Sequence, residues 1–279
     1  MRCHDPVTIR NPNKNCEDGI ASPDTILVPC GKCVACQVNK RTILIYRLLN
    51  EYKDHSCACM VTLTYACHAM QVLRQIVNPE TGEIKMKGKM VKDTYHVQVF
   101  QKFMKRLRKK VFVRFMMVAE YGSKFGRFHH HVIIFGLDCY NNRRHLQLVE
   151  SAWQMGFVYP TPFNYRSATY VAGYLIYPNN LLPEERPWML ISKNPAIGMN
   201  WLDKSKIQWY KDDPTRYYFP DGNFKKPLYR VYRKYIEASG VTFDIKPYET
   251  NFEDEPNYEY LQQQRQNYAE QIYKKCKKQ

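Results

Sequence analysis

The stretch EYGSKFGRFHHHVIIFG, residues 120–136, limits the fold of this chain more than any other segment. Its pattern predicts one strand that ends at Glu120, a turn rich in Gly and Lys, and a second strand from Phe128 to Phe135. The apolar run at the end of the second strand is typical of a buried strand and argues against a tag-like surface run of histidines. We therefore expect two neighbouring strands inside the core.

The histidines of this segment predict a metal site. Successive side chains on a strand alternate between its faces, so His129 and His131 point to one side and His130 points to the other. If the two strands are antiparallel neighbours, the short turn brings the carboxylate of Glu120 beside the histidine pair. Two nitrogens and one oxygen on rigid strands suit a divalent ion that also binds a phosphate.

The net charge of +16 on 279 residues predicts an anionic polymer as the partner. Nucleic acid fits this charge best, and an acidic membrane surface fits it less well. The chain has 22 tyrosines, many of them interleaved with Lys or Arg, as in YRVYRKY at residues 229–235. Such interleaving is typical of surfaces that stack bases, although ordinary amphipathic elements carry it as well.

The sequence predicts a soluble, unsecreted protein. It has neither a signal-like start nor an apolar run long enough to cross a membrane. We therefore expect the ten cysteines to be thiols or metal ligands in a reducing compartment rather than disulfides.

Three cysteines near the N-terminus are candidate zinc ligands. Cys30, Cys33 and Cys36 recur at every third position in VPCGKCVAC, just before an apolar helical pattern, and so resemble half of a zinc knuckle. The fourth ligand stays open between Cys3, Cys16 and His4. Zinc and plain reduced thiols remain equal alternatives.

The rest of the first half alternates predicted strands and helices. Residues 1–24 carry three prolines and lack a period, which predicts an irregular arm. The β-branched run Cys59 to Tyr65 predicts a strand, which we expect at the centre of the sheet. Residues 78–83, NPETGE, predict a turn flanked by solvated lysines.

A helix with one basic face is predicted to begin at Asp93 or Thr94. Its apolar positions repeat at helical spacing and predict a buried face. The other face is a candidate DNA contact, although a solvated charged face explains the same pattern. The candidate DNA-binding residues are Lys102, Lys105, Arg106 and Lys109, together with Arg127 in the predicted turn.

The segment SATYVAGYLIY predicts a helix that opens at Ser167 and ends before Pro178. Tyr170, Tyr174 and Tyr177 share one face of it. Such a stripe is usually core packing. A basic chain with a metal site and no other obvious nucleophile favours attack by Tyr170 and Tyr174 on a phosphate, which a bound metal would make more electrophilic.

The order and spacing of these motifs resemble the HUH-type rolling-circle replication initiators, and in particular those of small single-stranded DNA phages of the gokushovirus type. The resemblance runs through most of the chain and rests on VPCGKCVAC, VTLTY, FQKFMKRLRK, EYGSKFGRFHHHVIIFG, ATYVAGYLIY and SKNPAIGMNWL. It implies that Glu120, His129 and His131 bind the metal and that Tyr170 and Tyr174 are paired nucleophiles.

The resemblance also implies a fold and a function. The fold is α+β, with a central antiparallel sheet, helices packed on one face, and the tyrosine helix beside the metal. We expect a Cys-rich segment and helix at 1–50, the nicking domain at 51–185, and a basic, Tyr-rich extension with a helical tail at 186–279. The implied reaction nicks and rejoins origin DNA with Mg²⁺ or Mn²⁺, in the cytoplasm of an infected bacterium, with host helicase and polymerase as partners.

The chain departs from the family pattern within the tyrosine helix. Gly173 stands where a basic residue is common, and Tyr177 replaces a lysine, so either Lys193 substitutes for that lysine or turnover is impaired. A non-catalytic DNA-binding or packaging protein on the same scaffold is therefore the alternative, and a hydrolytic metallonuclease is a second one.

Overall fold

A computed structural model describes residues 3, 5–10, 25–66, 94–122, 127–176 and 187–243, and isolated positions between 260 and 271. The predicted turn at 78–83, Tyr177 and most of the predicted helical tail lie outside these residues. Among the helices within these ranges, none has the length and apolar composition needed to span a membrane.

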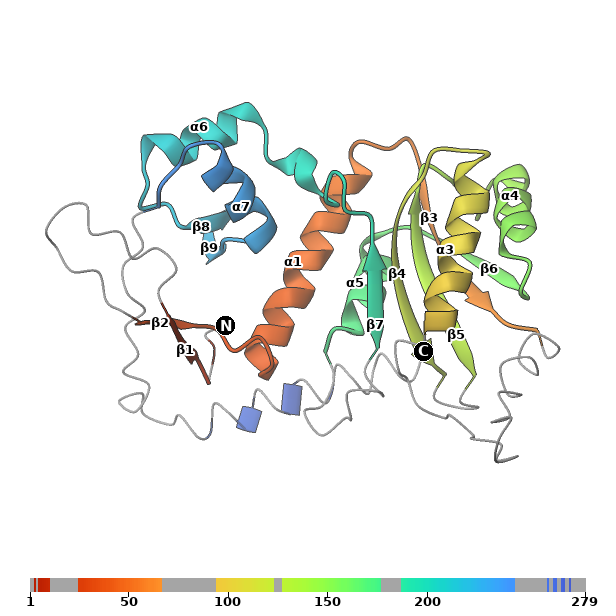
Figure 1. The fold of residues 1–279 in the computed structure, drawn as a ribbon, viewed down its shortest axis with the longest axis horizontal. Helices are drawn as coiled ribbons and strands as arrows, with labels where there is room; N and C mark the ends of the chain where they lie inside the picture. The colour runs from red at the N-terminus through yellow and green to blue at the C-terminus, as the bar shows by residue number, and fades with distance from the viewer. Residues whose placement is uncertain are drawn as a thin grey trace, which may run out of the picture.

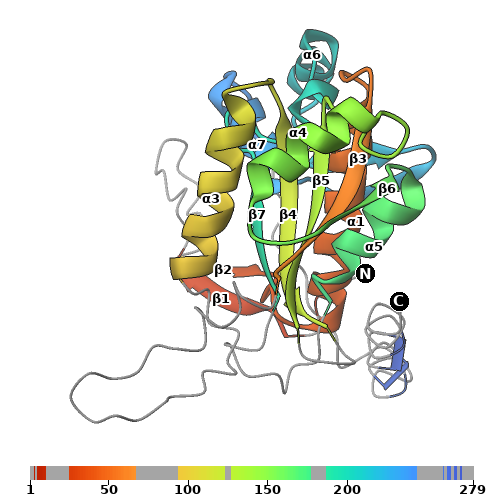
Figure 2. The same cartoon turned by 90° about the vertical axis from the view of Figure 1, so that its right-hand side faces the viewer.

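The core of the fold is a five-stranded antiparallel sheet in the order β6-β3-β5-β4-β7, which Figure 2 views face-on. Its strands are β3 (Ala58–Thr64), β4 (Arg114–Tyr121), β5 (Phe128–Phe135), β6 (Val158–Pro162) and β7 (Trp188–Ile191). The antiparallel α+β class is as predicted. The strand expected at the centre, β3, is one place off it, because β5 occupies the middle.

Helices cover both faces of the sheet, as Figure 1 shows, and the expectation of helices on one face only was wrong. The helices α3 (Thr94–Arg108) and α4 (Arg143–Trp153) pack on one face. The helices α1 (Val34–Tyr52) and α5 (Tyr165–Gly173) pack on the other. The reason lies in the strand sequences: β4 and β5 are apolar at nearly every position, so both faces must be removed from water.

Side-chain alternation along β5 divides the core in two. Val132 and Ile134 pack with Phe100, Phe103 and other residues toward α3 and α4. Ile133 and Phe135 pack toward α1 and α5. Each face of the sheet is therefore buried by its own pair of helices.

The part after β7 forms a small unit with its own apolar cluster. It contains η2 (Met199–Trp201), α6 (Lys204–Asp212), β8 (Tyr218–Asp221), β9 (Phe224–Pro227) and α7 (Arg230–Ala238), and it packs on Ile43 and Tyr46 of α1. Two elements outside the predicted domain 51–185 complete the main layer: α1 covers the sheet, and β7 pairs with β4.

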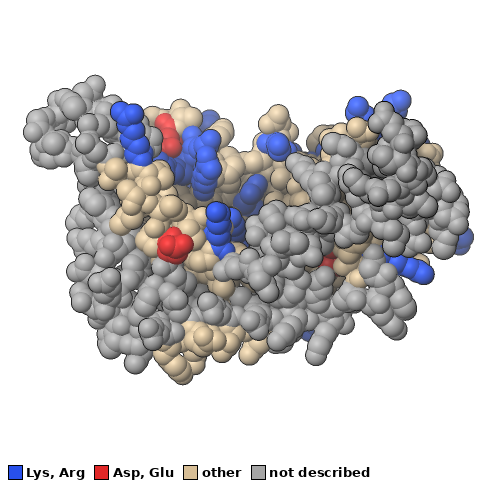
Figure 3. All heavy atoms as spheres, turned by 60° about the horizontal axis from the view of Figure 1, so that its bottom comes forward, with Lys and Arg blue, Asp and Glu red and all other residues tan. Residues whose placement is uncertain are grey.

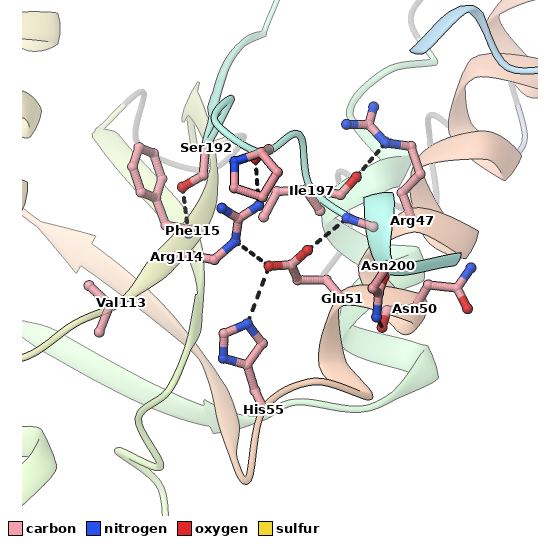
Figure 4. A network of polar contacts seen from close by, with 12 residues as sticks. Arg47, Asn50, Glu51, His55, Val113, Arg114, Phe115, Ser192, Ile197 and Asn200 are labelled. Atoms are coloured by element: carbon pink, nitrogen blue, oxygen red, sulfur yellow. Dashed lines mark hydrogen bonds and ion pairs between the residues drawn. The ribbon is translucent and has the colours of Figure 1, made fainter. Parts of the chain in front are cut away.

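A buried polar network joins α1, β4 and the segment after β7 (Figure 4). The Glu51 carboxylate pairs with Arg114 and accepts a hydrogen bond from the Gly198 N–H at 2.7 Å. Arg114 also donates to the Pro195 carbonyl at 2.7 Å. Gly198 has φ +75°, and a Cβ there would lie 2.5 Å from the Arg47 carbonyl oxygen, so only glycine fits.

The N-terminal region differs from the irregular arm that was expected. Val7–Arg10 forms strand β1, which pairs antiparallel with β2 (Thr25–Val28). All four residues of β1 are exposed, so this hairpin adds little apolar burial of its own.

Candidate metal centre and tyrosine pair

The pairing of β4 with β5 places the three predicted metal ligands together. Glu120 pairs directly with His129 across the two strands. His131 follows two residues later and shares the face of His129 that looks toward α5. The predicted alternation is confirmed, since His130 lies in the opposite core, against Tyr65 and Phe100.

The donor atoms of the three side chains converge. The Nε2 atom of His129 lies 2.9 Å from Oε1 of Glu120, and that of His131 lies 3.3 Å from the same oxygen. The two Nε2 atoms are 3.1 Å apart. Two imidazole nitrogens and a carboxylate oxygen aimed at one point form a donor set that fits a divalent ion.

The other ring nitrogen of each histidine has a fixed partner. The Nδ1 atom of His129 lies 3.0 Å from the carbonyl oxygen of Arg127, and Nδ1 of His131 lies 3.0 Å from the hydroxyl of Thr62. Such contacts orient a ligating imidazole and hold the proton on Nδ1, which leaves Nε2 free to bind metal. Sequence analysis placed Thr62 in a strand but gave it no role; its position opposite His131 was visible only once the pairing was known.

Burial and ion pairing set the charge of the site. Burial alone would raise the pKa of the Glu120 carboxyl, but hydrogen bonds with His129 and His131 outweigh it and lower that pKa to about 2. Burial also lowers the pKa of His131, against the opposing effect of Glu120. Near neutrality the site therefore holds a carboxylate and a neutral imidazole, the protonation states that bind metal.

The tyrosine helix is shorter than predicted and begins earlier. Asn164, not Ser167, is the N-cap: its side chain accepts from the Ser167 N–H at 3.0 Å, and the Ser167 hydroxyl accepts from the Asn164 N–H at 2.8 Å. This reciprocal capping box starts the helix at Tyr165. The helix ends at Gly173, and Tyr174 is its C-cap.

Both candidate nucleophiles reach the predicted ligands. The hydroxyl of Tyr170 lies 3.1 Å from Nε2 of His131, and that of Tyr174 lies 2.7 Å from Oε1 of Glu120. The two hydroxyls are 2.6 Å apart. Tyr170 is half-buried, whereas Tyr174 is only 4% exposed. Burial and the nearby Glu120 carboxylate raise the pKa of Tyr174 far above its ordinary value.

His130 has the polar partner that a neutral buried imidazole needs. It is fully buried, its Nε2 atom lies 3.0 Å from the Tyr65 hydroxyl, and burial lowers its pKa well below the ordinary value. It is therefore a neutral core residue, pointing away from the three ligands.

The basic residues of α3 lie on the face of the sheet opposite the metal ligands. Lys102, Lys105 and Lys109 are exposed. Arg106 instead donates to the carbonyl oxygens of Ala152 and Trp153, at 2.7 and 3.2 Å, at the end of α4. Arg127 is exposed and stands just before β5, two residues from His129.

Two other sequence features lie away from the site. Lys193 follows β7 next to Ser192, whose N–H donates to the carbonyl of Phe115, at the end of β4 remote from Glu120. It therefore does not stand in for the missing lysine. In the segment YRVYRKY, Tyr229 and Tyr232 are buried in the core of the small unit, and only Tyr235 among its tyrosines is more than half exposed.

The three predicted zinc ligands lie together, and Cys3 joins them. The four sulfur atoms all lie within 4.8 Å of one another. The other two candidates for the fourth position, Cys16 and His4, lie outside the described residues.

Comparisons with known proteins agree with this geometry. Residues 58–177, which contain both the metal-ligand set and the tyrosine pair, match a family model of replication-associated proteins, the ORF2 family. No solved structure matches the chain significantly.

Two phage proteins are similar to this chain. The replication-associated protein VP4 of Bdellovibrio phage phiMH2K is 24% identical over 76% of this chain and 68% of its own length. The replication-associated protein ORF4 of Chlamydia phage 1 is 31% identical over 39% of this chain and 24% of its own length. The family match and these similarities place the chain, through the segment that builds its sheet and its site, in the ORF2 family of replication-associated proteins, among the replication initiators of small phages.

Proposed function

We propose that this protein nicks single-stranded or locally melted origin DNA by tyrosine transesterification and later rejoins the strands. The observation that carries the proposal is the meeting of two phenols with the ligand cluster: Tyr170 at 3.1 Å from His131, and Tyr174 at 2.7 Å from Glu120. A nucleophile within hydrogen-bond reach of a metal ligand set is poised to attack a phosphate held there.

Glu120, His129 and His131 would hold Mg²⁺ or Mn²⁺. Bound there, the ion would polarise the scissile phosphate and stabilise its developing negative charge. The ligands leave the side toward α5 occupied by the two hydroxyls. Thr62 and the Arg127 carbonyl would keep both imidazoles in the ligating tautomer.

The proposed step balances as an exchange of esters. A bond forms between the phenolic oxygen and phosphorus, and the bond from phosphorus to the 3′ oxygen breaks. The phenol gives up its proton, and the departing oxygen takes one to become a free 3′-OH. The 5′-phosphotyrosine keeps the ester energy, so the reverse attack by a 3′-OH reseals the strand without ATP.

The second tyrosine gives the protein a way to cut again while the first is occupied. In this proposal the free 3′-OH primes rolling-circle synthesis of a viral single-stranded genome by the host polymerase and helicase, in the cytoplasm of the infected bacterium. The net charge of +16 supports DNA as the partner. Figure 3 views the end of the molecule where β4 ends and α1 begins, and on its described surface blue Lys and Arg side chains outnumber red acidic ones.

The test is incubation of the protein with Mn²⁺ and a labelled origin oligonucleotide, followed by denaturing electrophoresis. We expect an adduct that survives denaturation and disappears with EDTA. His129→Ala or His131→Ala should remove cleavage while largely sparing DNA affinity. Equal loss of binding in those variants would assign the histidines a structural role.

The same experiment separates the rival functions. A packaging or regulatory protein on this scaffold would bind the oligonucleotide and leave it whole. A hydrolytic metallonuclease would cut it without any adduct, with the tyrosines serving only as packing.

A further inference from the structure

We propose that Cys3, Cys30, Cys33 and Cys36 form a structural zinc centre that fastens the N-terminal hairpin to the start of α1. This inference is independent of the proposed nicking reaction. It rests on the geometry of four cysteines and on the weak packing of the hairpin that they enclose.

The sulfur positions fit a single tetrahedral ion. Four thiolates about 2.3 Å from a zinc ion lie about 3.8 Å from one another in a tetrahedron. The Sγ atoms of Cys3 and Cys33 are 3.8 Å apart, and all four Sγ atoms fall within 4.8 Å of one another. None of the four is in a disulfide. The group is too tight to enclose a multi-iron cluster and has the size for one ion.

The turn between Cys30 and Cys33 is shaped for a thiolate. Gly31 adopts φ +73°, which favours glycine, and the N–H groups of Lys32 and Cys33 both point at the sulfur of Cys30, at 3.4 and 3.3 Å. The N–H of Cys30 in turn points at the sulfur of Cys3, at 3.2 Å. Backbone donors of this kind stabilise the negative charge that metal-bound sulfur carries.

Positive charge near the group offsets that of four thiolates. Cys33 is the N-cap of α1 and Cys36 lies in its first turn, at the positive end of a 19-residue helix. The ammonium group of Lys40 donates to the Gly31 carbonyl at 2.6 Å, one residue from Cys30. A four-thiolate centre is thus partly neutralised by groups already in place.

The hairpin that the cysteines enclose needs such a fastening. Cys3 precedes β1, and Cys30 follows β2, so an ion between them would close the base of the hairpin. The β1 residues are all exposed, with Val7 at 48% and Ile9 at 40%. A lone two-stranded hairpin is marginal in water, and small units without a core commonly depend on a metal. Yet Cys3 and Cys36 are buried, at 3% and 5% exposure.

The centre would also brace the tyrosine helix. Val34 stands next to Cys33 and packs in a small apolar cluster with Ile176, two residues after Tyr174. Zinc at the start of α1 would therefore hold the point where α1 meets the end of the tyrosine segment.

Elemental analysis of the purified full-length chain tests the proposal. We expect one zinc per chain, retained in the variant His129→Ala with His131→Ala and lost in Cys30→Ser with Cys33→Ser. Cys57→Ser, which changes a partly buried cysteine outside the group, is the matched control and should keep its zinc. Limited proteolysis should release the N-terminal segment only from the Cys30→Ser, Cys33→Ser variant.

A second measurement serves if that variant does not fold. Cobalt titrated into the wild-type chain after zinc removal should give the intense visible bands and sulfur charge-transfer absorption of a tetrahedral thiolate site. Iron in place of zinc, disulfides among the four cysteines, or zinc that survives the double serine change would each overturn the proposal.

Discussion

The hydroxyl of Tyr174 lies 2.7 Å from Oε1 of Glu120, although 54 residues separate the two in the sequence. The contact ties the C-terminal end of α5 to the last turn-facing residues of β4. It also leaves Tyr170, one helical turn earlier, as the more exposed of the two phenols.

Exchange of the tyrosines should separate their roles. Tyr170→Phe with Tyr174→Phe should abolish the covalent adduct with DNA. Of the single changes, Tyr170→Phe should reduce the first-turnover adduct more, because Tyr174 is buried and its pKa is strongly raised. Denaturing gels of a single-turnover reaction measure this. Tyr165→Phe, at the exposed start of the same helix, is the control; an undiminished adduct in the double variant would eliminate this helix as the nucleophile.

Thr62→Val should weaken metal binding without touching a ligand atom. The change removes the hydroxyl that orients His131, and loss of such a partner typically costs about 10- to 100-fold in metal affinity. Titration of Mn²⁺ against adduct formation measures the shift, and excess Mn²⁺ should restore most of the activity. Thr64→Val is the matched control, since that hydroxyl contacts the Phe157 carbonyl instead of an imidazole. Equal effects of both changes would mean that Thr62 acts only through the strand.

The salt dependence of DNA binding should locate the DNA path. Arg127→Ala should lower the slope of log affinity against log salt by about 0.7, the value for one phosphate contact on a single strand. Lys102→Ala with Lys105→Ala tests whether α3, on the far face of the sheet, is a second track. A fall of about 1.4 supports that prediction, and an unchanged slope refutes it.

Glu51→Ala should destabilise the fold strongly. It leaves the buried Arg114 without its carboxylate, and breaking a buried ion pair from one side typically costs about 3–5 kcal/mol. Urea unfolding measures the loss. Glu237→Gln breaks the more exposed Arg233 pair within α7 and should cost less than about 1 kcal/mol. Similar losses in both variants would contradict the importance given to the network in Figure 4.

The metal-ligand hairpin was predictable because its information is local. Alternation on one strand fixes which of His129, His130 and His131 share a face, and a short turn determines where Glu120 returns. The position of Tyr170 and Tyr174 beside it came from the family resemblance and not from periodicity, since an aromatic stripe predicts packing equally well.

The features that sequence analysis missed depend on contacts between distant segments. Cys3 could not be chosen over Cys16 or His4 until β1 had paired with β2. Tyr229 and Tyr232 looked like base-stacking residues because the core that buries them forms only when the segment after 199 folds against α1. The start of α5 was missed because Asn164 and Ser167 both suit a cap, and their reciprocal hydrogen bonds decide between them.

The central place of β5 ties reactivity and folding to a single choice of register. A slip of one residue would turn His130 toward the tyrosines and drive both ligand imidazoles into a dry interior. Catalysis and core closure would fail in the same event. Viral variation along this strand can thus exchange side chains but cannot add or remove a single position.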